Sequence, residues 1–123
     1  MAIEIELVPF LTPQVTAVAD LRTHQRKLVQ VTPSGVGLAD VRSGGTAYVL
    51  GNAPNTGEVA AVICGPNAPK VIAGEAIGIG QCVQPMSVSG LAGVTSAGNI
   101  AAVGEAWSTA AGSGGVFTLK LWK

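Results

Sequence analysis

The spacing of glycines between Val71 and Trp107 limits this part of the chain to short extended pieces joined by turns. Each apolar step between glycines is too short for a helix of ordinary length, and glycine readily adopts the positive φ of tight turns. Two pieces, Gln81–Val88 and Asn99–Trp107, are compatible with β-strands. We therefore expect a compact β-meander in which Trp107 belongs to the core. The glycines concerned are Gly74, Gly78, Gly80, Gly90, Gly93, Gly98 and Gly104.

Segments bounded by turns predict further strands in the first half of the chain. Leu28–Thr32 alternates, a turn at residues 33–35 follows it, and Thr46–Leu50 is rich in β-branched and aromatic residues. Glu58–Cys64 is the most continuous apolar segment, so we expect a central, buried strand there. Strands this short, separated by Gly/Pro turns, predict a mainly β fold: a small antiparallel β-barrel or sandwich with at most one short helix.

The last segment, Val116–Trp122, predicts a strand with two different faces. Phe117, Leu119 and Leu121 alternate along it and are expected to point into the core. Trp122 falls on the opposite, mixed face. There it either covers the mouth of the barrel or anchors a contact with a partner protein, as exposed aromatic residues often do.

Residues 1–12 are expected to form an extended N-terminal arm, followed by a single β domain over residues 13–123. Prolines at positions 9 and 13 interrupt any β-ladder, so Val8, Pro9, Phe10 and Leu11 cannot belong to a central strand. This apolar stretch either folds back over its own core or docks on a neighbouring subunit.

A short helix is expected within residues 13–27. Thr12 and Pro13 are suitable for a helix start, and Ala17, Leu21, His24 and Leu28 recur at helical spacing. On such a helix Asp20 would pair with His24. The same region holds the one basic cluster of the chain, which either contacts phosphate or an acidic partner or is simply a solvated face. Its members are Arg22, His24, Arg26 and Lys27.

The sequence offers no set of residues typical of an enzyme, a cofactor site or a metal site. His24 with Asp20 or Asp40 could suggest a hydrolase, but no nucleophile is marked. Cys64 and Cys82 are expected to be reduced and partly buried thiols, and the only histidine is far from both in sequence.

Other functional classes are also disfavoured by composition. The formal net charge is 0, with 7 basic and 7 acidic residues, so there is no global attraction to nucleic acid or to an anionic membrane. No apolar run approaches the length of a membrane span, and Glu4 and Glu6 stand where a signal peptide would be basic. A carrier-type barrel would need a lysine at a hairpin tip, and Lys70 lacks the flanking residues of such modules.

The shortage of charge points to an assembled protein. Only 11% of the 123 residues are charged, against about 25% in typical soluble domains. A small monomer of this composition would expose much neutral or apolar surface, and such surface usually marks an interaction site.

The C-terminal half resembles the small head-decoration, or cement, proteins of tailed bacteriophages. The resemblance covers about residues 70–122 and lies in pattern and spacing. The segments that carry it are AGEAIGIGQCV at residues 73–83, IAAVGEA at residues 100–106 and VFTLKL at residues 116–121. The first 45 residues depart from this pattern.

The resemblance implies a β-tulip-like structural protein on the outer surface of the virion, made in the host cytoplasm. It would bind as a homotrimer at threefold and quasi-threefold sites between major capsid subunits and stabilise the head. The interface residues expected are Val8, Pro9, Phe10, Leu11, Arg22, Arg26 and Trp122. A phage tail or fibre component is the alternative, and a carrier-type module is a more distant one.

Overall fold

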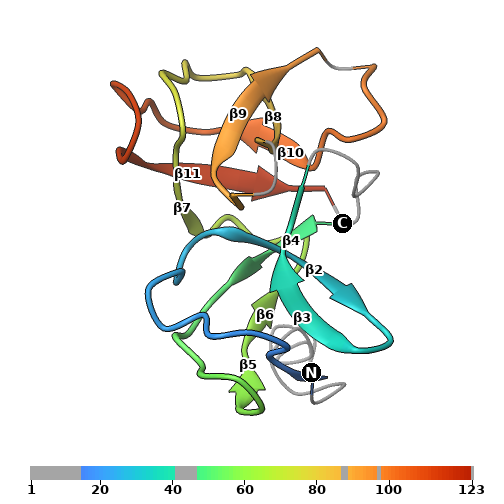
Figure 1. Cartoon of the computed structure of the whole chain (residues 1–123). Helices are drawn as coiled ribbons and strands as arrows, with labels where there is room; N and C mark the ends of the chain where they lie inside the picture. The colour runs from blue at the N-terminus through green and yellow to red at the C-terminus, as the bar shows by residue number, and fades with distance from the viewer. Residues whose placement is uncertain (1–14, 41–46, 87–88, 97, 123) are drawn as a thin grey trace, which may run out of the picture.

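The predicted mainly β fold is confirmed by the structure, a computed structural model that describes residues 15–40, 47–86, 89–96 and 98–122. These residues form eleven short strands in three antiparallel sheets, and no helix occurs among them. The arrangement is a layered, sandwich-like fold, and no ladder closes it into a barrel (Figure 1).

The first half of the chain forms a four-stranded and a two-stranded sheet, which occupy the lower part of Figure 1. The four-stranded sheet has the order β3-β2-β4-β6, and β1 pairs with β5 in the small sheet. A tight hairpin at residues 33–34 joins β2 to β3, with Thr32 opposite Gly35. The strands are β1 (Val15–Thr16), β2 (Leu28–Thr32), β3 (Gly35–Leu38), β4 (Ala47–Leu50), β5 (Val59–Ala60) and β6 (Val62–Ile63).

The second half forms one five-stranded sheet with the order β7-β11-β10-β8-β9, in the upper part of Figure 1. Its two edge strands approach each other through a single bridge between Ala73 and Ala92, which curls the sheet without closing it. The strands are β7 (Lys70–Ile72), β8 (Cys82–Pro85), β9 (Ala92–Thr95), β10 (Gly104–Ala106) and β11 (Val116–Leu121).

Alternation along the four-stranded sheet places side chains in two cores, one on each of its faces. In β2, Leu28 points toward the five-stranded sheet and Val29 toward the two-stranded sheet, and both are fully buried. The larger core combines residues of both halves, including Val49 of β4 with Phe117 and Leu119 of β11. The four-stranded sheet is therefore the middle layer, with the five-stranded sheet packed on one of its faces and the two-stranded sheet on the other.

The helix expected within residues 13–27 is wrong for the described residues 15–27, which form β1 followed by turns. Ala17 and Leu21 are buried, as their spacing suggested, but their backbone amides bond to another segment. The amide of Ala17 donates to the carbonyl of Glu58 and that of Leu21 to the carbonyl of Pro54, each at 2.9 Å. Tertiary hydrogen bonds thus replace the intrahelical ones.

The expectation of one central strand at Glu58–Cys64 is also wrong, because the segment divides between two sheets. Ala61 is the point of change: its amide donates to Asn52 Oδ1 at 2.9 Å and its carbonyl accepts from the amide of Gly51 at 2.7 Å. The residues before it pair with β1 and those after it form the edge strand β6. Val59 is accordingly 52% exposed.

Candidate interaction surface

The outer face of the five-stranded sheet carries both tryptophans of the chain. In β11, Phe117, Leu119 and Leu121 are fully buried, as expected, so the residues between them point outward. Cross-strand pairing extends this face from Lys120 of β11 to Glu105 of β10 and on to Cys82 of β8. We call it the outer sheet face; its central members are Ile72, Glu105, Trp107, Val116, Thr118, Lys120 and Trp122.

Trp107 lies on this face, so the expectation that it belongs to the core is wrong. Its side chain is 54% exposed, whereas its neighbour Ala106 is fully buried. Because Ala106 fills the inward position, the next residue turns outward, and the amide of Trp107 is fixed by a 2.8 Å hydrogen bond to the carbonyl of Thr118. Lys120 Nζ lies 5.9 Å from the centre of the indole ring, within the range of a cation–π contact.

Trp122 stands at the end of the same face. It is 45% exposed, and its amide donates to the carbonyl of Val103 at 3.1 Å, which ties the last described residue to the sheet. Its ring is therefore partly open to solvent, and both interpretations of the sequence, a cover over the core and a contact with a partner protein, stay predictions. Val116, 46% exposed, adds apolar surface at the other end of β11.

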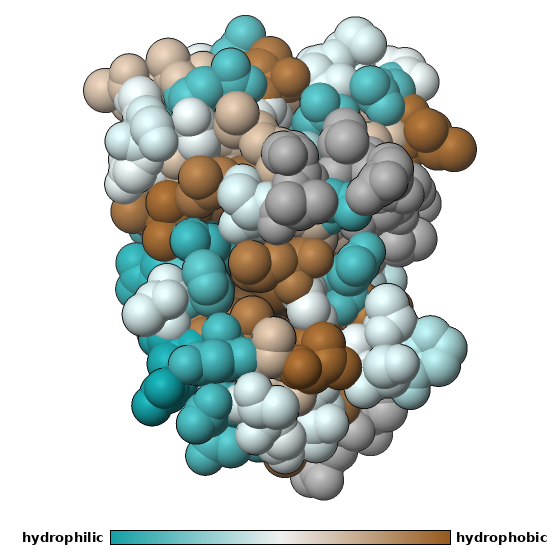
Figure 2. All heavy atoms as spheres, viewed as in Figure 1, coloured by the Kyte–Doolittle hydropathy of each residue, from teal (hydrophilic) through white to brown (hydrophobic). Residues whose placement is uncertain are grey.

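The outer sheet face therefore combines apolar anchors with a few polar groups. The backbone amides of Trp107 and Trp122 are hydrogen-bonded to the sheet, so both indole rings extend from fixed positions. An indole ring buries a large apolar area when a partner covers it, and tryptophan is enriched among the residues that dominate binding energies. Glu105 and Lys120 stand opposite each other on neighbouring strands and supply charge of both signs. Such a surface is suited to binding another protein. Figure 2, viewed as in Figure 1, shows separate hydrophobic patches among hydrophilic residues.

Arg22 of the predicted basic cluster is engaged within its own turn. It forms an exposed ion pair with Asp20, with 2.8 Å between Nη2 and Oδ2 and a second bond from Nε to Oδ1 at 2.9 Å. These hydrogen bonds lower the pKa of Asp20 to about 2 and raise that of Arg22. An arginine held in this way is a poorer candidate for a partner contact than the sequence suggested.

His24 does not form the expected pair with Asp20. Its Nδ1 lies 2.9 Å from Lys27 Nζ, so the lysine donates to a neutral imidazole. Burial, followed by the Lys27 charge, lowers the pKa of His24. With Asp20 bound to Arg22 and His24 bound to Lys27, the geometry offers no support for a hydrolase built on Asp20 and His24.

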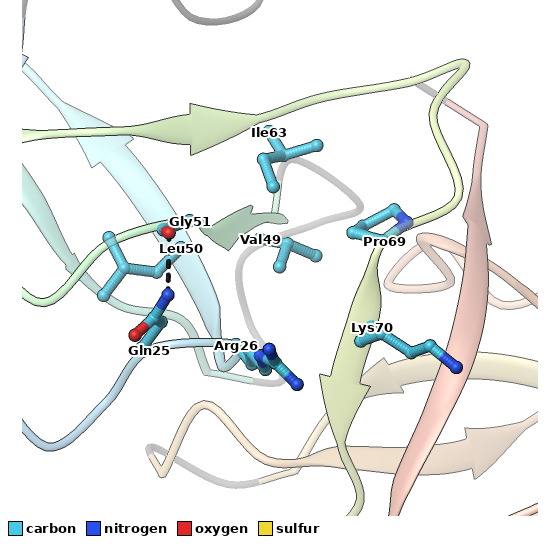
Figure 3. Close-up of a pocket in the computed structure, with 8 residues that line it drawn as sticks. All are labelled: Gln25, Arg26, Val49, Leu50, Gly51, Ile63, Pro69 and Lys70. Atoms are coloured by element: carbon cyan, nitrogen blue, oxygen red, sulfur yellow. Dashed lines mark hydrogen bonds between the residues drawn. The ribbon is translucent and has the colours of Figure 1, made fainter.

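Arg26 lines a pocket of about 200 Å³ at the junction of the two halves, and Lys70 lies on the same pocket (Figure 3). Arg26 thus lines a pocket together with a lysine from the second half of the chain, whereas Arg22 forms an ion pair with Asp20. Lys70 begins β7 and pairs with Thr118 of β11, so it does not stand at the hairpin tip that a carrier module requires.

The remaining predicted residues divide into two groups. Val8, Pro9, Phe10 and Leu11 lie outside the described residues. Cys64 and Cys82 are half-buried, as expected, and are not bonded to each other.

Over the described ranges, no three His, Cys, Asp or Glu side chains gather in a group that could hold a metal ion. In the same part of the chain, no helix is long and apolar enough to cross a bilayer.

Comparison of the chain with family models, with curated proteins and with solved structures gives no significant match. The interpretation of the surface therefore depends on its own residues.

Sequence reasoning missed Trp107 and Lys120 as surface residues, although a signal was present. Glu105 precedes Trp107 by two positions, so in a strand the two share a face, and a carboxylate seldom faces a core. The charge of Glu105 therefore indicates the direction of Trp107 better than the size of the indole ring does.

Proposed function

We propose that this protein is a structural virion component that decorates the outside of an icosahedral phage head. It binds as a homotrimer at threefold and quasi-threefold sites between major capsid subunits and stabilises the shell. The outer sheet face is the surface that we assign to this contact, with Trp107 and Trp122 as its anchors.

The observation that carries the proposal is the coincidence of two features in one sheet. The segments that resemble head-decoration proteins contribute β8, β10 and β11, which are neighbours in the five-stranded sheet. The same sheet exposes both tryptophans on its outer face. A structural role needs surface to bury, and here the surface lies on the part of the chain that carries the resemblance.

The energetics of repeated binding fit the same role. Burying apolar surface contributes about 25 cal/mol per Å², against which ordering and association costs are set. Three copies of a modest face around a threefold axis act together by multivalency, so no single site has to bind tightly.

A tail or fibre component is the runner-up, and immunogold labelling of virions separates it from the leading proposal. Antibody against the purified protein should decorate heads of the source phage and leave tails unlabelled. Label confined to tails or fibres would replace the head assignment by the alternative. Light scattering coupled to size-exclusion chromatography tests the trimer, for which a mass near three times 12.3 kDa is expected.

A further inference from the structure

The pocket at the junction of the two halves is built from segments far apart in the sequence. Val49 and Ile63 come from the middle sheet and Lys70 from β7. In Figure 3 the side chains of Val49, Ile63 and Pro69 lie above Arg26 and Lys70, and the amine of Lys70 extends away from Arg26. The residues that line it are Gln25, Arg26, Val49, Leu50, Gly51, Ile63, Pro69 and Lys70. The lining therefore combines apolar side chains with two basic residues.

Arg26 is held in an unusual backbone conformation at this pocket. Its φ is 70°, which places a side-chain-bearing residue in the region that favours glycine. Its amide donates to the carbonyl of Leu50 at 2.8 Å, and its carbonyl accepts from the amide of Ile72 at 3.0 Å. Strain of this kind is found preferentially at functional sites. Here the two bonds fix the base of the arginine side chain against both halves.

Arg26 and Lys70 also differ from the other cations that the structure describes. Arg22 pairs with Asp20, Lys27 bonds to His24, and Lys120 lies against Trp107. The side chains of Arg26 and Lys70 have no ion-pair or hydrogen-bond partner in the described part of the chain. Among the described residues, two unpaired cations thus line one pocket, and no carboxylate of these residues lines it with them.

The size of the pocket suits a single side chain. Its volume of about 200 Å³ is below the range of about 300–1,000 Å³ that is typical of small-molecule sites. The amide of Gln25 is already engaged, because its Nε2 donates to the carbonyl of Gly51 at 2.9 Å. An occupant must then offer negative charge to Arg26 and Lys70 and a short apolar stem to the apolar side chains of the lining.

We propose that this pocket receives a glutamate side chain of the partner protein, paired with Arg26 and, once its flexible side chain turns toward the pocket, with Lys70. Its methylene groups pack against Val49, Ile63 and Pro69, while an arginine guanidinium can bind a carboxylate in a bidentate manner. Inorganic phosphate would satisfy the charge but leave the apolar side chains of the lining without contacts. The proposal rests on the proposed function in one respect, since the partner is the surface that the protein decorates.

The test is an NMR titration of the full chain with isotope-labelled methyl groups on Ile and Val. The probe is N-acetyl-glutamate N-methylamide, with the uncharged glutamine analogue and inorganic phosphate as comparison ligands. We expect saturable shifts at the methyl groups of Val49 and Ile63 with the glutamate probe, and binding at least about tenfold weaker for the other two. Equal shifts with the glutamine analogue, or none at these methyls, would overturn the proposal, and so would phosphate binding as tightly as glutamate.

Matched variants locate the effect. Lys70→Gln lies at an ordinary strand position, and Arg26→Gly keeps the backbone conformation while removing the guanidinium; each should weaken the glutamate probe at least about fivefold. Arg22→Gln removes the same charge outside the pocket and should leave the affinity unchanged. If Arg22→Gln weakened the probe as much as the pocket variants, the assignment to this pocket would be overturned.

The titration uses no phage head, so its outcome is separate from the proposed function. If the protein binds phage heads but its Val49 and Ile63 methyl groups show no shifts with the glutamate probe, only the pocket proposal is refuted. A glutamate response in a protein that fails to bind heads would support the pocket and contradict the proposed partner.

Discussion

At the scale of single residues, the direction in which a side chain points decides its role in this protein. Phe117 and Trp107 are both aromatic; Phe117 lies in β11, and Trp107 directly follows the neighbouring strand β10. Phe117 is fully buried and Trp107 is 54% exposed, because Phe117 points into the core while Trp107 turns outward beyond the inward-facing Ala106. Sequence alternation identified the direction of Phe117 correctly and should have identified that of Trp107 from its partner Glu105.

This difference in direction makes a prediction about stability. Phe117→Ala should lower the free energy of unfolding by about 3–5 kcal/mol, since it empties a fully buried site. Trp107→Ala should change it by no more than about 1 kcal/mol, because half of the ring already faces water. Urea unfolding followed by circular dichroism measures both. A large loss in the Trp107 variant would mean that the ring is structural.

The strained backbone of Arg26 makes a second prediction. Arg26→Gly should raise the free energy of unfolding by up to about 1 kcal/mol, because glycine adopts a φ of 70° without steric cost. Thermal unfolding should show a higher midpoint than for Arg26→Ala, which keeps the strain. If the glycine variant were less stable than the alanine variant, the strain interpretation would fail.

His24 predicts how stability depends on pH. Its pKa is lowered in the folded state, chiefly by burial and then by Lys27, so the unfolded chain binds its proton more readily. The stability it contributes is therefore present above its ordinary pKa of 6.5 and is lost as pH falls through the lowered folded value. His24→Gln should flatten the dependence of stability below pH 6.5, as measured by urea unfolding at several pH values. An unchanged slope in this variant would contradict the assignment.

At the scale of elements, the sequence predicts strands that are defined by their own alternation and flanking turn residues. It does not predict segments whose structure depends on hydrogen bonds to residues distant in the sequence. Leu28–Thr32 and the strand that ends at Leu121 form as expected, since alternation and turn residues define them locally. The segment around Ala17 and Leu21 was misjudged because its backbone bonds to residues 54–58, and no local pattern records that. β9 was missed because Ala92–Thr95 is made of small residues and becomes a strand only through pairing with β8.

The close pairing of β10 and β11 predicts a strong effect at Gly104. A Cβ at this position would collide with the backbone carbonyl of Lys120, which a flexible side chain cannot relieve. Gly104→Ala should therefore cost about 1–3 kcal/mol or more of unfolding free energy. Gly112→Ala is the matched control, because a Cβ there meets no atom within 4 Å and the variant should unfold like the parent. Equal stability of the two variants would contradict the pairing.

At the scale of the whole molecule, the outer sheet face and the pocket at the junction of the halves were only partly visible in the sequence. Low charge indicated a surface to be covered, and Trp122 was identified as a candidate contact. Lys70 could not be assigned to the same pocket as Arg26 from the sequence, because they are 44 positions apart and line one pocket only through the packing of the two halves. Neither site could be assembled without the sheet order.

The central claim is that the outer sheet face binds a phage head through its two tryptophans. Co-sedimentation with expanded, undecorated heads of the source phage tests it most directly, comparing the parent protein with Trp107→Ala/Trp122→Ala. We predict saturable binding of the parent and at least about a tenfold loss in the double variant, with the fold retained by circular dichroism. A parent protein that stays in the supernatant, or a double variant that sediments as fully as the parent, would contradict the claim.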